Sequence, residues 1–461
     1  MKGPDNNARV VVVRDCSRFP ELTREQEIWL RKLVSGTKTA DMLLRLGDPG
    51  DDAEQDDDPL ATFDSASGIW WAGRYVGEIQ FEGLTLRMEP RFGMPALMRW
   101  LSTVWGVRLV ESKGTPRQQR IWLWLIIAHL WVGRLIAAAK HGLPSRRVDT
   151  VHQGQALRGR LLAQKTALAR RTGDDCLVSM TRTRAIDAKI GGILLAAFER
   201  LDAALKEYGE PLRWLPERAR TLVEEVSNAL GSRERRIPKG VRPTIRYSPI
   251  TEGYRPIVDL SLSILEHRPL LPASEGDRKA IGIVLDMAEI WELYVAKMLQ
   301  AALPAFRVRH TGRSRDNFRW LLRSSTDNDR LGSLRPDIIV SDLRERCLAI
   351  VDAKYKTTRI STSNRTGVVT EDLYQLAAYL SAFGESGSRL DGFLVYPEDE
   401  LGQVAQRLAA KNPWSLFAAP QRNLWFVSVD CGSVADASIQ SEHRMASMVQ
   451  SAIIGRRNYL I

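Results

Sequence analysis

The sequence contains 461 residues, with 66 Lys and Arg against 55 Asp and Glu, and therefore a formal net charge of +11. At about 150 residues per domain, this length predicts two or three domains that each bury a core. Hydrophobic residues make up 44% and charged residues 26%, which argues against extended disorder and against a membrane-embedded protein. The four cysteines lie far apart without a CxxC pair, and the N-terminal segment has no apolar signal core, so we expect a cytoplasmic protein without disulfides.

An acidic run at residues 48–58 (DPGDDAEQDDD) conceals part of the basic excess. It holds seven acids in eleven residues, and we expect a solvated loop because like charges at that density repel one another. Its spacing does not match an EF-hand loop, so calcium binding is not expected. The rest of the chain carries 66 basic against 48 acidic residues, an excess of 18, which predicts a polyanionic partner, nucleic acid before membrane.

The first part of the chain, residues 1–115, is predicted to be a β-rich domain. Short apolar runs separated by Gly and Pro favour strands at residues 10–13, 69–71 and 83–88.

Residues 116–271 are predicted to be a helical middle region. Apolar residues recur there at three- and four-residue spacing in segments 121–140, 190–208 and 217–230. The first segment is strongly apolar, but it contains a histidine and an arginine. Its uninterrupted apolar run is also shorter than the roughly 20 residues that cross a bilayer, so we expect a buried helix.

A basic segment closes this region at residues 231–246 (GSRERRIPKGVRPTIR), and its Pro and Gly residues predict a loop. It either contacts a DNA backbone or is a solvated connector, and both interpretations stay open. Its candidate DNA contacts are Arg233, Arg235, Arg236 and Lys239.

Residues 269–277 (PLLPASEGD) have the composition of a linker and place the main domain boundary near position 272. The domain that follows, residues 272–461, is predicted to be α/β, with helices that flank a mixed sheet. Its predicted elements are, in order, a helix at 281–303, strands at 337–340 and 347–355, a helix at 371–383, and strands at 392–396 and 424–429.

Two strands of this domain carry a cluster of charged residues. Asp337 opens one strand, and Asp352 and Lys354 lie in the next, after a connection short enough for a hairpin. Residues i and i+2 of a strand project from one face, so Asp352 and Lys354 point together and the antiparallel hairpin brings Asp337 beside them. Two close carboxylates repel unless a divalent cation lies between them, and Mg²⁺ suits such ligands. An amine beside the cation can orient water and stabilise charge on a phosphate, so the cluster predicts phosphodiester hydrolysis.

Two flanking helices add candidate residues. Glu289 and Glu292 lie one turn apart in MAEIWELYVAKML, and one or both could reach a metal site. Gln375 and Tyr379 share one face of EDLYQLAAYL, an arrangement that suits contacts to a carboxylate, to water or to a DNA phosphate. The histidines show no HExxH spacing and no GxSxG motif exists, so a zinc hydrolase and a serine hydrolase are not expected.

The segments RPDIIV, AIVDAKYK and YQLAAY resemble the PD-(D/E)XK nuclease core with the trailing QxxxY motif of RecB-like nucleases. Together with WELYV and LVYP they resemble more narrowly the McrC family, the nuclease subunits of McrBC-type modification-dependent restriction systems. The upstream likeness is weaker. Residues 76–93 (VGEIQFEGLTLRMEPRFG) resemble the N-terminal strand motif of the family, although Arg91 stands where lysine is usual. LRGRLL resembles the family's Gly-Arg motif, and YRPIVDLSLSIL resembles the segment before the nuclease. DAKIGG stands where an Asn-containing stretch is expected.

The resemblance implies roles for individual residues. Asp337 and Asp352 would be metal ligands for Mg²⁺, Lys354 the catalytic amine and Glu292 the acid on the helix. Gln375 and Tyr379 would form the trailing motif, and Lys356, on the face of Lys354, would contact phosphate.

The resemblance also implies a partner, an McrB-like AAA+ GTPase hexamer that binds GTP and recognises double-stranded DNA. The sequence has no Walker A loop of its own; SGTKT at residues 35–39 lacks the leading glycine and the Gly-Lys step. The leading hypothesis is therefore a Mg²⁺-dependent endonuclease subunit whose N-terminal domain docks this partner and which stimulates its GTPase. The alternatives are a stand-alone RecB-like repair nuclease and a non-catalytic scaffold that activates the GTPase.

Overall fold

The structure is a computed structural model of the chain, and it divides the chain into two compact units. The first unit joins residues 1–112 to residues 269–461, and the second comprises residues 113–268. The residues that the structure describes are 10–36, 58–105, 121–206, 214–230, 245, 247–249, 251–266, 281–311, 318–327, 329–355, 370–385, 388–398, 407–432 and 435–454. The predicted acidic loop, apart from its last residue, and the basic segment, apart from residue 245, lie outside these ranges.

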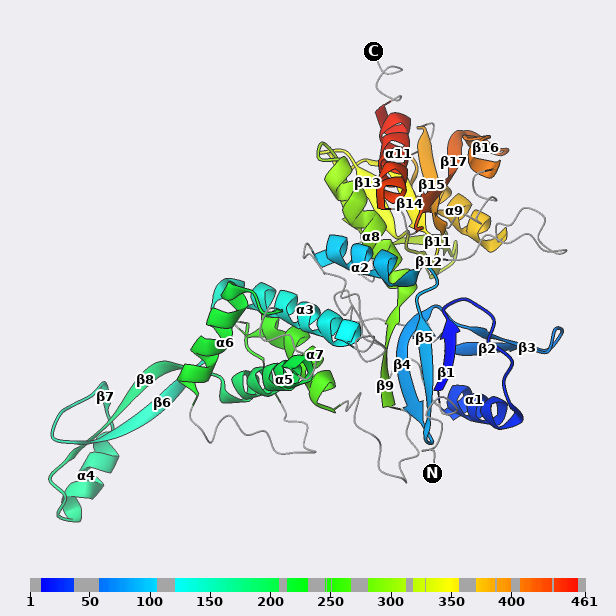
Figure 1. Cartoon of the computed structure of the whole chain (residues 1–461). Helices are drawn as coiled ribbons and strands as arrows, with labels where there is room; N and C mark the ends of the chain where they lie inside the picture. The colour runs from blue at the N-terminus through cyan, green and yellow to red at the C-terminus, as the bar shows by residue number, and fades with distance from the viewer. Residues whose placement is uncertain are drawn as a thin grey trace, which may run out of the picture. The chain divides into compact units, whose positions relative to one another are not determined.

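The first unit begins with a four-stranded sheet in the order β1-β5-β4-β9. It consists of β1 (Val10–Arg14), β4 (Tyr75–Phe81), β5 (Leu84–Glu89) and β9 (Ile281–Asp286). β1 and β5 are parallel, whereas β4 pairs with β5 and with β9 in antiparallel fashion. In Figure 1, β9, drawn in green, lies beside the blue β4, although the two strands are about 200 residues apart in sequence.

One face of this sheet is covered by α1 (Arg24–Gly36). Trp29, Leu30 and Leu33 of α1 are buried in one cluster with Ile79 and Leu86 of the strands. The amphipathic spacing of these three residues gives the helix its single apolar face. A small antiparallel hairpin accompanies the sheet, formed by β2 (Ala61–Asp64) and β3 (Ile69–Ala72).

The predicted helix at residues 281–303 is wrong over its first six residues. These residues form β9, and the helix itself is α8 (Met287–Ala302). A short apolar run such as IGIVLD fits a strand and a buried helix equally well, and here pairing with β4 decides for the strand. Asp286 ends the strand and caps the helix, because its carboxylate accepts a hydrogen bond from the Ala288 amide at 2.9 Å.

The predicted α/β architecture of the last domain is confirmed by a six-stranded mixed sheet, in the order β10-β13-β14-β15-β17-β16. β14, β15 and β17 are mutually parallel, while β10, β13 and β16 run antiparallel to their neighbours. The strands are β10 (Arg307–His310), β13 (Ile338–Ser341), β14 (Cys347–Ala353), β15 (Leu390–Glu398), β16 (Trp414–Leu416) and β17 (Ala419–Asp430).

Helices pack against this sheet, as predicted. α9 (Thr370–Phe383) contributes Leu376 and Leu380 to a core cluster with Ile350 and Leu394 of the strands. A separate hairpin packs against α9, formed by β11 (Arg319–Arg323) and β12 (Arg330–Leu334).

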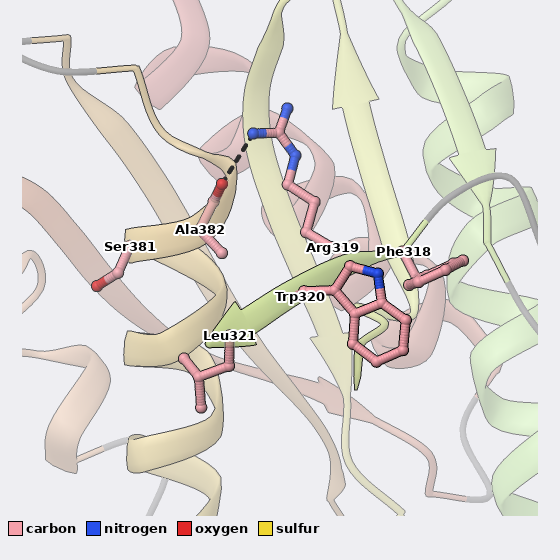
Figure 2. A pocket seen from close by; sticks show the side chains of 6 residues that line it. All are labelled: Phe318, Arg319, Trp320, Leu321, Ser381 and Ala382. Carbon is pink, nitrogen blue, oxygen red and sulfur yellow. Dashed lines mark hydrogen bonds between the residues drawn. The ribbon is translucent and has the colours of Figure 1, made fainter. Parts of the chain in front are cut away.

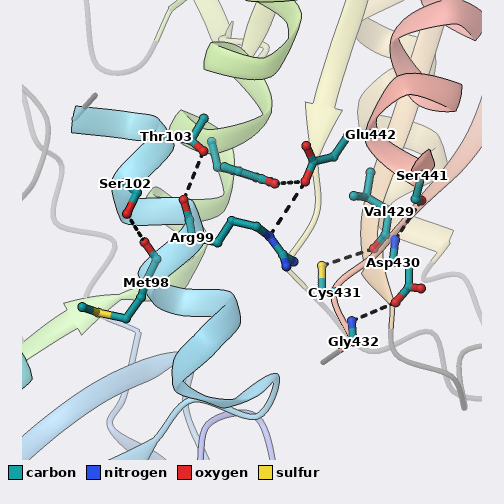
Figure 3. Close-up of polar contacts among 11 residues, drawn as sticks. Met98, Arg99, Ser102, Thr103, Val429, Asp430, Cys431, Gly432, Ser441 and Glu442 are labelled. Atoms are coloured by element: carbon teal, nitrogen blue, oxygen red, sulfur yellow. Dashed lines mark hydrogen bonds and ion pairs between the residues drawn. The ribbon is translucent and has the colours of Figure 1, made fainter. Parts of the chain in front are cut away.

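α2 (Gly93–Trp105), α8 and α11 (Ala435–Ile454) also pack against one another in this unit. Arg99 of α2 lies 3.9 Å from Glu442 of α11 (Figure 3). Tyr294 of α8 donates a hydrogen bond to the same carboxylate. The helix that follows the N-terminal sheet is thereby tied to the C-terminal helix.

The second unit combines helices with a long β-ribbon. The helices are α3 (Ile121–Ala138), α5 (Ala188–Lys206), α6 (Glu217–Ala229) and α7 (Arg255–Glu266), with short 3₁₀ turns η4 (Ala139–His141) and η5 (Glu252–Tyr254). The ribbon pairs β6 (Ser145–Gly154) with β8 (Leu177–Ile186), and it also holds β7 (Arg160–Leu161) and α4 (Ala163–Arg171). Figure 1 shows the ribbon extending from the helices of its unit, with α4 at the far end.

The predicted middle region was thus incomplete, because the ribbon was missed. β6 (SRRVDTVHQG) is largely exposed along its length, so it lacks the apolar alternation by which a half-buried strand is recognised. The predicted buried helix is confirmed by α3, in which Ile126, Ile127 and Trp131 are fully buried. Among the residues that the structure describes, no helix is long and apolar enough to cross a membrane.

Candidate active site

The predicted hairpin brings three charged residues together. β13 and β14 are antiparallel, with Ile338 opposite Val351, so Asp337 lies next to the end of β14. One Asp337 carboxylate oxygen accepts a hydrogen bond from the Ala353 amide at 2.7 Å. Lys354 Nζ lies 2.9 Å from Oδ2 of Asp352, as expected for residues that project from one face of a strand.

α9 holds the lysine from the other side. Lys354 donates to Gln375 Oε1 at 2.6 Å, and Gln375 Nε2 donates in turn to the Tyr379 hydroxyl at 2.9 Å. That hydroxyl donates to the Arg335 carbonyl, also at 2.9 Å. The chain of hydrogen bonds therefore fixes both the lysine amine and the backbone that leads into Asp337.

One further acid of this group was not predicted from the sequence. Asp372 of α9 is only 2% exposed, and its Oδ1 lies 4.0 Å from Lys354 Nζ. Asp372, Gln375 and Tyr379 are spaced i, i+3 and i+7, which is one helical face, so the spacing that identified the last two also contained the signal for the first.

The second helix acid is placed by α8. Glu292 Oε2 lies 3.6 Å from Nε2 of His310, on β10, and its charge acts on Asp337. Of the two helix acids that the sequence left open, Glu292 is therefore the one that the structure places near Asp337. His310 beside it was not anticipated, because it lies in a strand with no recognisable motif.

Burial and crowding shift the ionisation of the group. Burial, the charge of Glu292 and the charge of Asp352 together raise the pKa of Asp337 well above its usual value. Burial also raises the pKa of Asp352, although Lys354 opposes it. Burial alone would lower the pKa of Lys354, but Asp352 and Asp337 leave it raised, so the amine stays protonated at neutral pH.

These properties fit a divalent cation held by Asp337 and Asp352. Within the described residues, no regular hydrogen bond reaches either buried oxygen of Asp352, although the Lys354 amine lies close to one of them. Two acids that repel each other gain most from a cation between them. The described ranges contain no set of three His, Cys, Asp or Glu side chains placed to bind one ion, so water and substrate oxygens would complete the coordination.

Five further predicted residues lie outside the described part of the chain, so the structure does not place them. They are the candidate phosphate and DNA contacts Arg233, Arg235, Arg236, Lys239 and Lys356.

An open hollow lies at the C-terminal end of α9 (Figure 2). It is lined by Phe318, Arg319, Trp320 and Leu321 from the β11 side and by Ser381 and Ala382 from α9. Arg319 donates a hydrogen bond to the Ala382 carbonyl at 2.9 Å. Its lining includes none of the predicted site residues.

Comparison with known proteins gives one family and several solved structures. A family model described as "McrBC 5-methylcytosine restriction system component" matches residues 71–397. A half-complex from the tetradecameric assembly of Thermococcus gammatolerans McrB AAA+ hexamers with bound McrC is similar, with 15% identity, TM-score 0.47, and coverage of 95% of this chain and 100% of that chain. The Thermococcus gammatolerans McrBC complex matches with 16% identity and TM-score 0.33, over 64% of this chain and 88% of that one. No curated relative matches significantly.

Proposed function

Because the chain belongs to the family of McrBC 5-methylcytosine restriction system components, we propose that it is the DNA-cutting subunit of such a system. It would be a Mg²⁺-dependent endonuclease that hydrolyses phosphodiesters of modified DNA. The observation that carries this proposal is the meeting of Asp337, Asp352 and Lys354 at one hairpin, with the lysine held by Gln375.

The residues of the group have separable tasks in this reaction. Asp337 and Asp352 would hold the cation, which supplies charge neutralisation at the scissile phosphate and an acidified water. Lys354 is protonated, so it stabilises negative charge on the phosphate rather than accepting a proton. Gln375 fixes the direction of the amine, and Tyr379 fixes Gln375.

We also propose a partner, an McrB-like AAA+ GTPase hexamer whose GTP hydrolysis the chain stimulates. One similar solved structure is described as McrB AAA+ hexamers with bound McrC. The sequence of this chain lacks a Walker A loop, so in such a complex GTP would be bound by the ring.

The test uses the full chain with an McrB-type GTPase, GTP, Mg²⁺, and matched DNA with or without 5-methylcytosine. We expect modified DNA to be cut, and Lys354→Ala to reduce cutting by at least about 10²-fold. Lys354→Ala should still bind the ring and stimulate GTP turnover. Lys297→Ala, at an exposed position of α8, is the control and should cut normally.

Three other results would change the assignment. Unchanged cutting by Lys354→Ala would refute the proposed site. Cutting by the isolated chain, with no dependence on a GTPase, would favour the stand-alone repair nuclease. Stimulated GTP turnover without nicking in any divalent metal would favour the non-catalytic scaffold.

A further inference from the structure

A buried charged pair joins the N-terminal sheet to the residue that follows the candidate catalytic lysine. Asp15 follows β1 and is fully buried, and its Oδ1 accepts a hydrogen bond from the Arg91 amide at 2.6 Å. The Arg91 side chain is 8% exposed, and its Nε lies 3.9 Å from Asp15 Oδ2. The Arg91 guanidinium stacks over the ring of Tyr355, 4.3 Å from the ring centroid.

Two aromatic side chains, one just before α2 and one on it, pack against Tyr355. Its ring meets Phe92 and Trp100 edge-on, at centroid distances of 6.1 and 6.2 Å. Trp100, on α2, lies 5.0 Å from Trp291 of α8. We call Phe92, Trp100, Trp291 and Tyr355 the aromatic cage; all four are buried or half-buried.

The cage contains the chain neighbours of two candidate site residues. Tyr355 follows Lys354, and Trp291 precedes Glu292. Lys354 and Trp291 are anchored at one point, because the Lys354 amide donates to the Val395 carbonyl at 2.9 Å and Trp291 Nε1 donates to the same carbonyl at 3.2 Å. Because the cage contacts both chain segments, its displacement would move the amine of Lys354, just after β14, relative to the acid on α8.

Stability alone does not account for a charged pair at this place. Within the described residues, no hydrogen bond reaches the three guanidinium nitrogens of Arg91 or Oδ2 of Asp15. A buried pair with so few hydrogen bonds is weak support for folding, since apolar side chains of similar volume stabilise a core at least as well. What the pair does supply is a directional contact, which fixes Tyr355 against the sheet.

We propose that Arg91, held by Asp15, is a positioning residue that sets Lys354 and Glu292 at their working separation through the aromatic cage. Its effect on cleavage rests on the proposed nuclease function, whereas its effect on the local structure does not. Any movement of the junction between β5 and α2 would then change the cleavage rate without changing the residues that touch DNA.

The first measurement is amide hydrogen exchange of the full chain, which needs no catalysis. We compare wild type, Arg91→Met and Arg87→Met. Arg87 is a matched control on β5, paired with Glu78 and outside the cage. Arg91→Met should speed exchange in the peptide that contains Lys354 and in the one that contains Trp291, whereas Arg87→Met should not. Unchanged exchange at these peptides, or an equal change in the control, would overturn the proposal.

The second measurement is single-turnover cleavage in the complex with the GTPase ring. Arg91→Met should lower the maximal rate by about 10- to 100-fold at temperatures where it is fully folded, with the DNA concentration for half-maximal rate unchanged. Arg91→Lys keeps the charge beside Asp15 and over Tyr355, and should recover to within about threefold of wild type. A normal maximal rate in folded Arg91→Met, or no recovery in Arg91→Lys, would contradict the positioning role.

Removing Arg91 alone leaves Asp15 buried without its partner, and that variant could fail to fold. The double variant Asp15→Asn/Arg91→Met avoids the unpaired charge and carries the same two measurements with the same expected results. If the wild-type complex cuts no DNA, the proposed function fails, and hydrogen exchange still decides whether Arg91 positions Lys354.

Discussion

Replacing Asp337 by asparagine should stabilise the metal-free protein, although it removes a candidate ligand. The folded-state pKa of Asp337 lies above its usual value of 3.8 because of burial and the neighbouring Glu292 and Asp352. A carboxyl with a raised pKa stabilises the fold fully at a pH below its unfolded value and loses that stabilisation as the pH rises through its folded pKa. Without a cation, the wild-type protein should therefore become less stable as the pH rises above the ordinary carboxyl range.

Coulomb's law gives the order of magnitude of the effect. Two unit charges about 4 Å apart repel by about 4 kcal/mol at an effective dielectric constant of about 20. Burial and this repulsion raise the pKa of Asp337, and Asp337→Asn removes the charge that they disfavour, so the variant should gain on the order of 1–3 kcal/mol at pH 8. The side-chain oxygen of asparagine can still accept the hydrogen bond that the Ala353 amide donates to Asp337 at 2.7 Å.

The assay is urea and thermal unfolding at pH 6 and pH 8, with EDTA or with Mg²⁺. In wild type, Mg²⁺ at about 100 times its Kd should add about 2.7 kcal/mol, whereas Asp337→Asn should respond little. The control is Asp391→Asn, a buried acid of β15 that accepts hydrogen bonds from Asn423 and Trp425. It should lose stability in every condition and keep the response to Mg²⁺.

Two results would refute this reasoning. One is an Asp337→Asn variant that is less stable than wild type in EDTA at pH 8, because charge repulsion would then not dominate the site. The other is a full Mg²⁺ response in that variant, because Asp337 would then not hold the cation.

Three further substitutions give distinct outcomes. Asp286→Ala removes the N-cap of α8 and also the ion-pair partner of Arg74, whose Nη2 lies 3.0 Å from Asp286 Oδ2. Urea titrations should show a free energy of unfolding that is lower by about 3–5 kcal/mol. Gln375→Leu releases the amine of Lys354, and single-turnover assays should show cleavage lowered about tenfold or more with folding retained. Gly191→Val crowds α5 against the end of α6, where even a Cβ would lie 2.9 Å from a leucine methyl; urea unfolding should show a loss of about 1–3 kcal/mol in the second unit.

The geometry of the candidate site could be anticipated because its determinants are local. Asp352 lies on β14, Lys354 directly follows it and Asp337 directly precedes β13, so the antiparallel pairing of these two strands across a short turn places the three together. Gln375 and Tyr379 are one helical turn apart, and that spacing alone puts them on one face. No long-range information was needed for either step.

The remaining features depend on contacts that a linear pattern does not contain. β9 is a strand only because β4, about 200 residues earlier, pairs with it. Most of β6 and the second half of β8 are exposed, so the ribbon shows little of the apolar alternation by which a half-buried strand is predicted. Arg91 and Tyr355 are separated by more than 260 residues, so the sequence pattern around one does not indicate its contact with the other.

These long-range contacts bear directly on how the candidate site is held. The N-terminal sheet reaches it at two separate points: β9 continues into α8, which carries Glu292, and Arg91 holds Tyr355 at the end of β14. The first attachment is continuous in the chain and is reinforced by the Met287 amide, which donates to the Arg74 carbonyl at 3.1 Å. One attachment would leave α8 free to turn against β14, whereas two fix their relative orientation. The six-stranded sheet and the N-terminal sheet belong to one compact unit, so a boundary near residue 272 divides the chain in sequence without dividing the candidate site from its support.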